Sequence, residues 1–131
     1  MAVDLHSDAH AETLTMVTEY TLLHVHPGFQ KKFESTLPVA LELITNASGY
    51  ISHDVQRSVD DSSQYMLIVR WKSRADSCEN FRTSGRLHKI KLLLHKFYEI
   101  YPVTHFYETV ALEKPEPTPG EDQPTTLAGD K

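Results

Sequence analysis

The chain has 131 residues, of which 40% are hydrophobic, enough for one domain with a single core. The formal net charge is −5, but residues 1–14 and 113–131 each contribute −3, so residues 15–112 are close to neutral. A near-neutral core excludes the basic surface of a nucleic-acid-binding protein and the basic face of a membrane-surface helix. No stretch approaches the ~20 apolar residues that span a bilayer.

The two ends of the chain differ in composition from its middle. Residues 1–14 contain no basic residue and no apolar run of the secretory-signal type, and they are predicted to form a flexible N-terminal arm. Residues 113–131 are acidic and hold four of the seven prolines, which predicts a disordered tail. The single cysteine, Cys78, excludes an internal disulfide and favours a cytoplasmic location.

The first half of residues 15–112 predicts a strand followed by a helix. Residues 15–25 are rich in β-branched and aromatic side chains and predict the strand. Pro27 is suited to the first turn of the helix, and Pro38 predicts a kink or two short helices because it removes a backbone hydrogen bond. Spacings of three and four residues predict a buried stripe made of Phe29, Phe33, Leu37, Ala40 and Ile44.

The second half predicts a β-hairpin, a helical region and a last strand. Residues 50–59 and the apolar residues 65–69 form the expected antiparallel hairpin. Helices are expected over 74–83 and 86–99, and an extended strand over 103–112. The order βαββαβ predicts an α+β fold of ferredoxin-like topology with an antiparallel four-stranded sheet. The buried stripe of the last helix is predicted to contain Leu87, Ile90, Leu94 and Phe97.

Four local features resemble the antibiotic biosynthesis monooxygenase family. The first strand runs into Pro27-Gly28, and the string GYISHDVQRSVDDSSQYMLIVRW is similar to the family's middle hairpin, including the tryptophan at its end. The string WKSRADSCENFRTS resembles the next family segment, a Trp-x-Ser turn that leads into a helix. HFYETV resembles the last strand. The resemblance covers residues 15–111.

The resemblance implies a dimeric α+β barrel, in which two sheets pack face to face and each subunit keeps a pocket between its sheet and its helices. The apolar residues on both faces of 65–69 agree with a homodimer, because helices cover only one face of such a sheet. The resemblance also implies a cofactor-independent monooxygenase or quinol oxidase that uses molecular oxygen on a small aromatic or polyketide-like molecule. The alternative is a non-catalytic dimeric module for ligand binding or interaction.

Two histidines are the candidate catalytic residues. A histidine beside a half-buried pocket can take the proton of a phenol. His88 lies next to the predicted buried stripe of the last helix, and His53 shares a strand face with Arg57. Lys91 follows His88 by about one helical turn and would stabilise the phenolate once it has formed.

The predicted substrate pocket contains Tyr20, Thr21, Trp71, Phe81 and Lys91. Its aromatic members would line a slot for a planar substrate. The asparagine, tryptophan and histidine of the haem-degrading branch fall at Thr21, Phe81 and Lys91, so haem is not expected as a cofactor. No set of side chains predicts a metal site.

Overall fold

The computed structural model describes residues 15–113. The arm predicted over 1–14 lies outside the described residues, and so does the tail predicted over 113–131 except for its first residue. No helix within residues 15–113 is long and apolar enough to cross a membrane. Eight elements follow one another along this part of the chain: β1 (Val17–His24), α2 (Gln30–Thr45), β2 (Tyr50–Arg57), β3 (Gln64–Trp71), the π-helix η1 (Asp76–Phe81), α3 (Arg86–Leu94), the short 3₁₀ helix η2 (His95–Phe97) and β4 (Val103–Tyr107).

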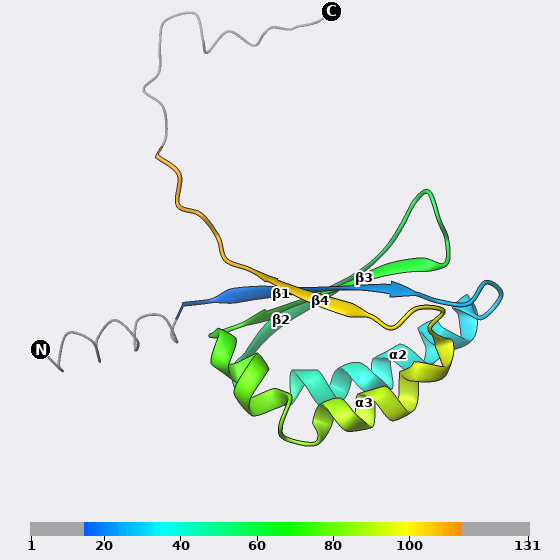
Figure 1. The fold of residues 1–131 in the computed structure, drawn as a ribbon, viewed down its shortest axis with the longest axis horizontal. Helices are drawn as coiled ribbons and strands as arrows, with labels where there is room; N and C mark the ends of the chain where they lie inside the picture. The colour runs from blue at the N-terminus through cyan, green and yellow to red at the C-terminus, as the bar shows by residue number, and fades with distance from the viewer. Residues whose placement is uncertain (1–14, 114–131) are drawn as a thin grey trace, which may run out of the picture.

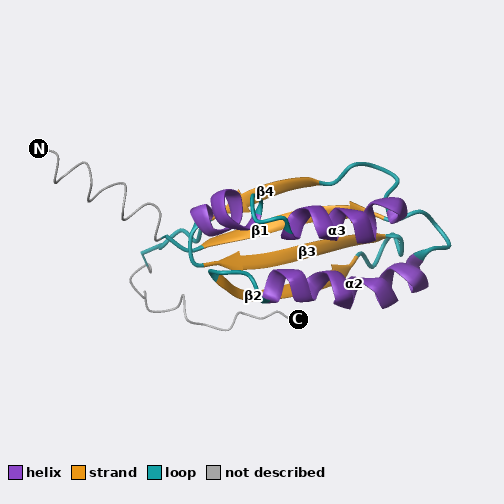
Figure 2. Cartoon of the chain, turned by 90° about the horizontal axis from the view of Figure 1, so that it is seen from below, coloured by secondary structure: helices purple, strands orange, loops and turns teal. Residues whose placement is uncertain are grey.

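The four strands form one antiparallel sheet in the order β2-β3-β1-β4. This order confirms the predicted α+β class and ferredoxin-like topology. Both α2 and α3 lie on the same face of the sheet, seen edge-on in Figure 1 and from the helical side in Figure 2. The opposite face is uncovered in the single chain (Figure 1).

The alternation of side chains along β1 divides the molecule into these two faces. Val17 and Leu23 point toward the helices and are buried, whereas the alternate residues Tyr20 and Leu22 lie on the uncovered face and are more exposed. Two core clusters occupy the two ends of the helical side. Leu23, Val25, Phe33, Leu37, Ala40, Tyr65, Leu94 and Phe97 form one, and Val17, Ile44, Val69, Trp71 and Phe81 form the other.

Helix α2 differs from its prediction in two respects. Pro38 lies inside one continuous helix and does not divide it. Its ring is on the exposed side, so the carbonyl of Glu34, which loses its usual amide partner, faces the solvent side of the helix. Phe29 precedes the first helical residue and is 50% exposed, so it does not belong to the buried stripe.

The segment after β3 also differs in detail from the prediction. The helix expected over 74–83 contains the π-turns of η1, and the helix expected over 86–99 ends as α3 at Leu94 and continues as η2. The last strand is shorter than expected and ends at Tyr107, which pairs with Thr18 near the beginning of β1. Beyond Tyr107, β1 offers little further chain with which to pair.

A close approach of two turns fixes the start of η1. The Ser73 hydroxyl accepts a hydrogen bond from the Asp76 amide at 3.2 Å and donates one to Asp76 Oδ2 at 3.0 Å. The Asp76 carboxylate lies directly against Gly49, where any Cβ would overlap it, and Gly49 has a left-handed φ of 84°. The contact therefore requires glycine at this position.

Candidate functional site

A cavity of about 660 Å³ lies between the sheet and α3. Its walls come from β1, β3 and β4, from the helical elements α2, η1, α3 and η2, and from the loop that precedes β4. The backbone of α3 lies closer to α2 than to the strands, and side chains of α3 such as Leu94 reach toward the sheet. The volume falls in the range that holds a small organic ligand.

A buried carboxylate closes one end of the cavity. Glu19 lies on the helical face of β1, is 8% exposed and accepts three hydrogen bonds. Trp71 Nε1 and the Ser77 hydroxyl donate to its Oε1 at 2.7 and 3.0 Å, and an Arg82 Nη donates to its Oε2 at 2.9 Å. Because Glu19 is ion-paired and its oxygens are occupied, it is suited to holding this wall together and not to taking a proton from a ligand.

The interior of the cavity is mostly apolar and aromatic. Trp71 and Phe81 pack with ring centroids 5.3 Å apart, and the Phe81 side chain is buried. Between β1 and β4 the hydroxyls of Thr21 and Thr104 hydrogen-bond to each other at 2.8 Å. A planar apolar molecule would therefore contact rings at one end and a single pair of hydroxyls along the sheet.

Exposed polar side chains mark the mouth of the cavity. The Lys91 ammonium lies 5.6 Å from the centre of the Tyr101 ring, which is 72% exposed. His95 follows Lys91 by four residues, and its Nδ1 is 2.8 Å from the Lys91 carbonyl oxygen. A carbonyl oxygen can only accept, so Nδ1 carries the hydrogen, and Nε2 of the neutral ring has the free lone pair.

Tyr98 lines the same part of the cavity. Burial raises the pKa of its phenol well above the ordinary tyrosine value, because the phenolate would lose its hydration. Tyr98 therefore stays protonated at neutral pH. Its side chain can donate a hydrogen bond to a ligand but cannot serve as a base there.

Four of the five predicted pocket residues lie on the cavity wall, namely Thr21, Trp71, Phe81 and Lys91. Tyr20 does not, which corrects its predicted placement. Neighbouring residues of a strand point to opposite faces, so Tyr20 faces the uncovered side while Thr21 faces the cavity.

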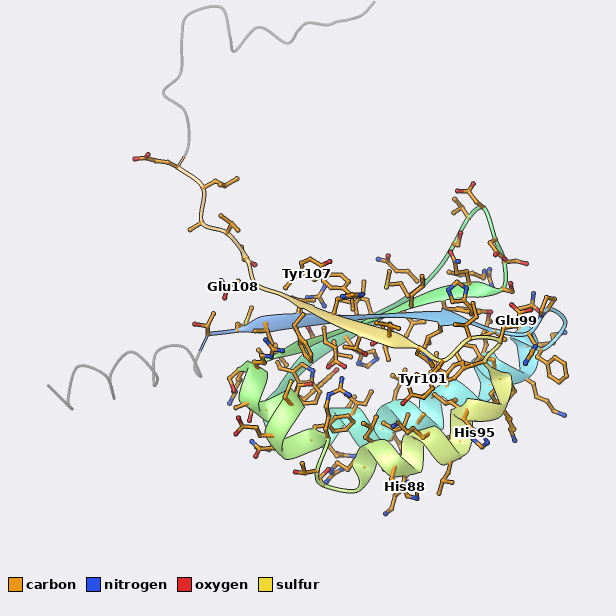
Figure 3. The ribbon with its side chains drawn as sticks, in the orientation of Figure 1. His88, His95, Glu99, Tyr101, Tyr107 and Glu108 are labelled. Carbon is orange, nitrogen blue, oxygen red and sulfur yellow. The ribbon has the colours of Figure 1, made fainter. Side chains whose placement is uncertain are left out.

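The two predicted catalytic histidines lie outside the cavity. His88 is exposed, and Figure 3 shows it on the side of α3 away from the sheet, which corrects its predicted placement. It is about 100° around the helix from the lining residue Leu87. His53 lies on edge strand β2, where its Nδ1 is 2.6 Å from the Tyr50 hydroxyl, and it does not line the cavity.

Sequence reasoning assigned no role to three polar residues on the cavity wall: Glu19, Arg82 and His95. Glu19 shares the strand face of Val17 and Leu23, so the alternation of β1 already placed a charge on a buried face. His95 is seven residues after His88 and lies on nearly the same side of the helix. Of the two, only His95 lines the cavity, together with Tyr98, Tyr101 and Pro102 of the loop before β4. Figure 3 shows His88, His95 and Tyr101.

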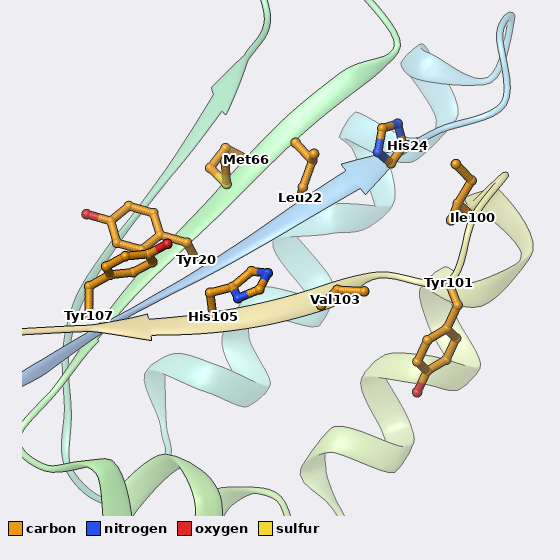
Figure 4. A pocket seen from close by; sticks show the side chains of 9 residues that line it. All are labelled: Tyr20, Leu22, His24, Met66, Ile100, Tyr101, Val103, His105 and Tyr107. Atoms are coloured by element: carbon orange, nitrogen blue, oxygen red, sulfur yellow. The ribbon is translucent and has the colours of Figure 1, made fainter.

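A second hollow, of about 570 Å³, lies on the uncovered face of the sheet. Figure 4 shows Tyr20 and Tyr107 packed against each other there, with His105 and His24 farther along the same face. The two tyrosine rings meet edge to face, 5.2 Å between centroids. No group of three or more potential metal ligands occurs among residues 15–113.

Comparison with known proteins relates most of this chain to one protein family. Residues 16–91 match the family model described as antibiotic biosynthesis monooxygenase. The uncharacterized protein YczJ of Bacillus subtilis is 33% identical over 95 residues, which are 72% of this chain and all of YczJ.

Solved structures show the same fold. A Bordetella bronchiseptica protein assigned to this monooxygenase family is 25% identical, with a TM-score of 0.70 over 74% of this chain and 99% of its own. SnoaB, a cofactor-independent oxygenase from Streptomyces nogalater, is 20% identical, with a TM-score of 0.63 over 78% of this chain and 99% of its own. The matched residues and the curated relative together show that this chain belongs to the antibiotic biosynthesis monooxygenase family.

Proposed function

We propose that this protein is a cofactor-independent monooxygenase that oxidises a phenol or hydroquinone of the aromatic or polyketide type. The observation that carries the proposal is the pairing of an aromatic cavity with His95, whose Nε2 lone pair is left free at the cavity mouth. Family membership and the shared fold of the oxygenase SnoaB support the same reaction class.

The proposed reaction begins when His95 Nε2 accepts the phenolic proton. The resulting anion is electron-rich and passes one electron to O₂, and the two radicals then combine to form a carbon–oxygen bond. One oxygen atom enters the product as a carbonyl, and the other leaves as water with the two hydrogens that the substrate loses. The substrate supplies all the electrons, so no external reductant is required.

The position of His95 replaces that of His88 in this proposal. His95 lines the cavity together with residues of the loop before β4, whereas His88 faces away from the cavity. His53, which contacts Tyr50 on β2, does not line the cavity.

The test is oxygen uptake with a panel of anthrones and hydroquinones, with a chelator and with added metal. We expect His95→Asn to slow the reaction by ~10²–10⁴. The asparagine amide can still donate to the Lys91 carbonyl, so the variant removes the base and keeps the local hydrogen bond. His88→Ala is the matched control and should keep full activity. A normal rate in His95→Asn, or its loss in His88→Ala, would refute the assignment.

The same cavity would also serve a non-catalytic binding module, and labelled oxygen separates the two functions. A monooxygenase places one atom of ¹⁸O₂ in the product. A module binds the phenol, which Trp71 fluorescence would report from the cavity wall, without consuming oxygen.

We also propose that two copies associate through the uncovered sheet face. Leu22, Val103 and Tyr107 lie there and are 36%, 59% and 59% exposed. A second copy of the same face would remove this surface from water.

A further inference from the structure

The charged side chains on the cavity wall carry a net positive charge. Glu19 and Arg82 neutralise each other through the contact at 2.9 Å. Lys91 is the remaining permanently charged group on the wall, and within residues 15–113 its ammonium forms no ion pair. The cavity therefore offers one uncompensated positive charge, at its mouth.

Helix electrostatics do not account for the side on which this charge lies. Lys91 occupies the last turn of α3, where a cation interacts favourably with the helix dipole. Lys89, two residues earlier, lies on the exposed outer side of the helix and not on the cavity wall. The position of Lys91 beside the exposed Tyr101 ring keeps its charge at the opening, in a cation–π contact that a carboxylate can displace.

We infer that the ligand is an aromatic acid, a phenol or hydroquinone with one carboxylate that pairs with Lys91. A single ammonium matches a monoanion, and at the mouth the carboxylate keeps part of its hydration while the rings enter the apolar interior. Lys91 and His95 are one helical turn apart, about 5.4 Å along the axis, so the carboxylate and a neighbouring hydroxyl would reach them together. This inference deepens the proposed function. The binding of an aromatic acid does not depend on that function, and only the acid's role as the substrate of the monooxygenase rests on it.

The test measures binding without turnover. Trp71 is the only tryptophan of the chain and lies on the cavity wall, so its fluorescence reports occupancy. In the absence of oxygen, the full-length protein is titrated with 1,4-dihydroxy-2-naphthoate and with the corresponding carboxamide. We expect the acid to bind ~10-fold or more tightly than the amide, with a preference that shrinks as salt is added.

Two lysine variants locate the preference. Lys91→Met should bind acid and amide equally, and Lys91→Arg should restore part of the difference. Lys89→Met removes the same charge from the outer side of the helix and should leave the preference intact. Equal binding of acid and amide by the native protein, no binding of either, or an undiminished preference in Lys91→Met would overturn the inference. A Lys91-dependent preference without oxygen uptake would uphold it and refute only the monooxygenase proposal.

Discussion

Removal of the Glu19 carboxylate should destabilise the fold, because its partners cannot all find replacements. Glu19→Ala leaves the Trp71 indole N–H and the Ser77 hydroxyl without their acceptor, and both side chains are at most 1% exposed. A buried donor left without a partner costs ~1–3 kcal/mol. The Arg82 side chain is 30% exposed and can turn to water, so its loss adds less. We expect a total loss of about 3 kcal/mol.

The assay is urea unfolding followed by circular dichroism and by Trp71 fluorescence. Glu19→Gln keeps an oxygen acceptor for Trp71 and Ser77 but loses the ion pair, so it should lose about half as much stability as Glu19→Ala. Glu42→Ala is the control, since this glutamate is exposed on α2 and should change stability by no more than ~0.5 kcal/mol. If Glu19→Ala unfolds at the same urea concentration as Glu42→Ala, the three hydrogen bonds of Glu19 do not stabilise the fold.

Three further predictions concern other parts of the chain. Gly49→Ala should lose at least ~1 kcal/mol more in urea unfolding than Gly28→Ala. Both glycines have a left-handed φ, but only at Gly49 would the new Cβ push Asp76 away from its hydrogen bonds with Ser73. Equal losses would contradict this. Because burial raises the pKa of Tyr98, its contribution to stability is complete below the ordinary tyrosine value of about 10 and declines as pH rises above it, by up to ~1.4 kcal/mol per pH unit. Tyr98→Phe should flatten this alkaline decline in unfolding experiments, whereas Tyr101→Phe should not; an unchanged slope in Tyr98→Phe would count against the buried phenol. Light scattering at micromolar concentration should give twice the mass of one chain. Val103→Lys on the uncovered face should halve the measured mass, whereas Val39→Lys on the exposed side of α2 should leave it unchanged. A monomeric native protein would rule out the dimer.

Local sequence patterns predicted the order of strands and helices, because each of these elements depends on residues that are close together in the sequence. Alternation along β1 and the stripe of α2 were both readable from the sequence. The Glu19 cluster was not, since its partners follow 52, 58 and 63 residues later and meet it only in the folded chain. Tyr20 and Thr21 were predicted to share one pocket, although the two-residue period of a strand separates them.

The histidine at the cavity mouth shows a second limit of local patterns. His88 and His95 have the same helical phase, so periodicity alone could not choose between them. The structure separates them, because His95 lines the cavity together with Tyr98, Tyr101 and Pro102 of the loop before β4, and His88 does not. Local sequence patterns predict the fold class, but they do not predict the path of this loop, which only the structure shows.

The π-helical form of η1 makes the Glu19–Arg82 ion pair sensitive to the number of residues in this segment. The Arg82 amide bonds to the Ser77 carbonyl five residues earlier, the wide turn that an extra residue in a helix produces. Deleting one residue between them would restore an ordinary helical turn and rotate Arg82 by about 100° relative to Ser77. Among homologues, substitutions within this segment should therefore be tolerated more readily than a gain or loss of one residue.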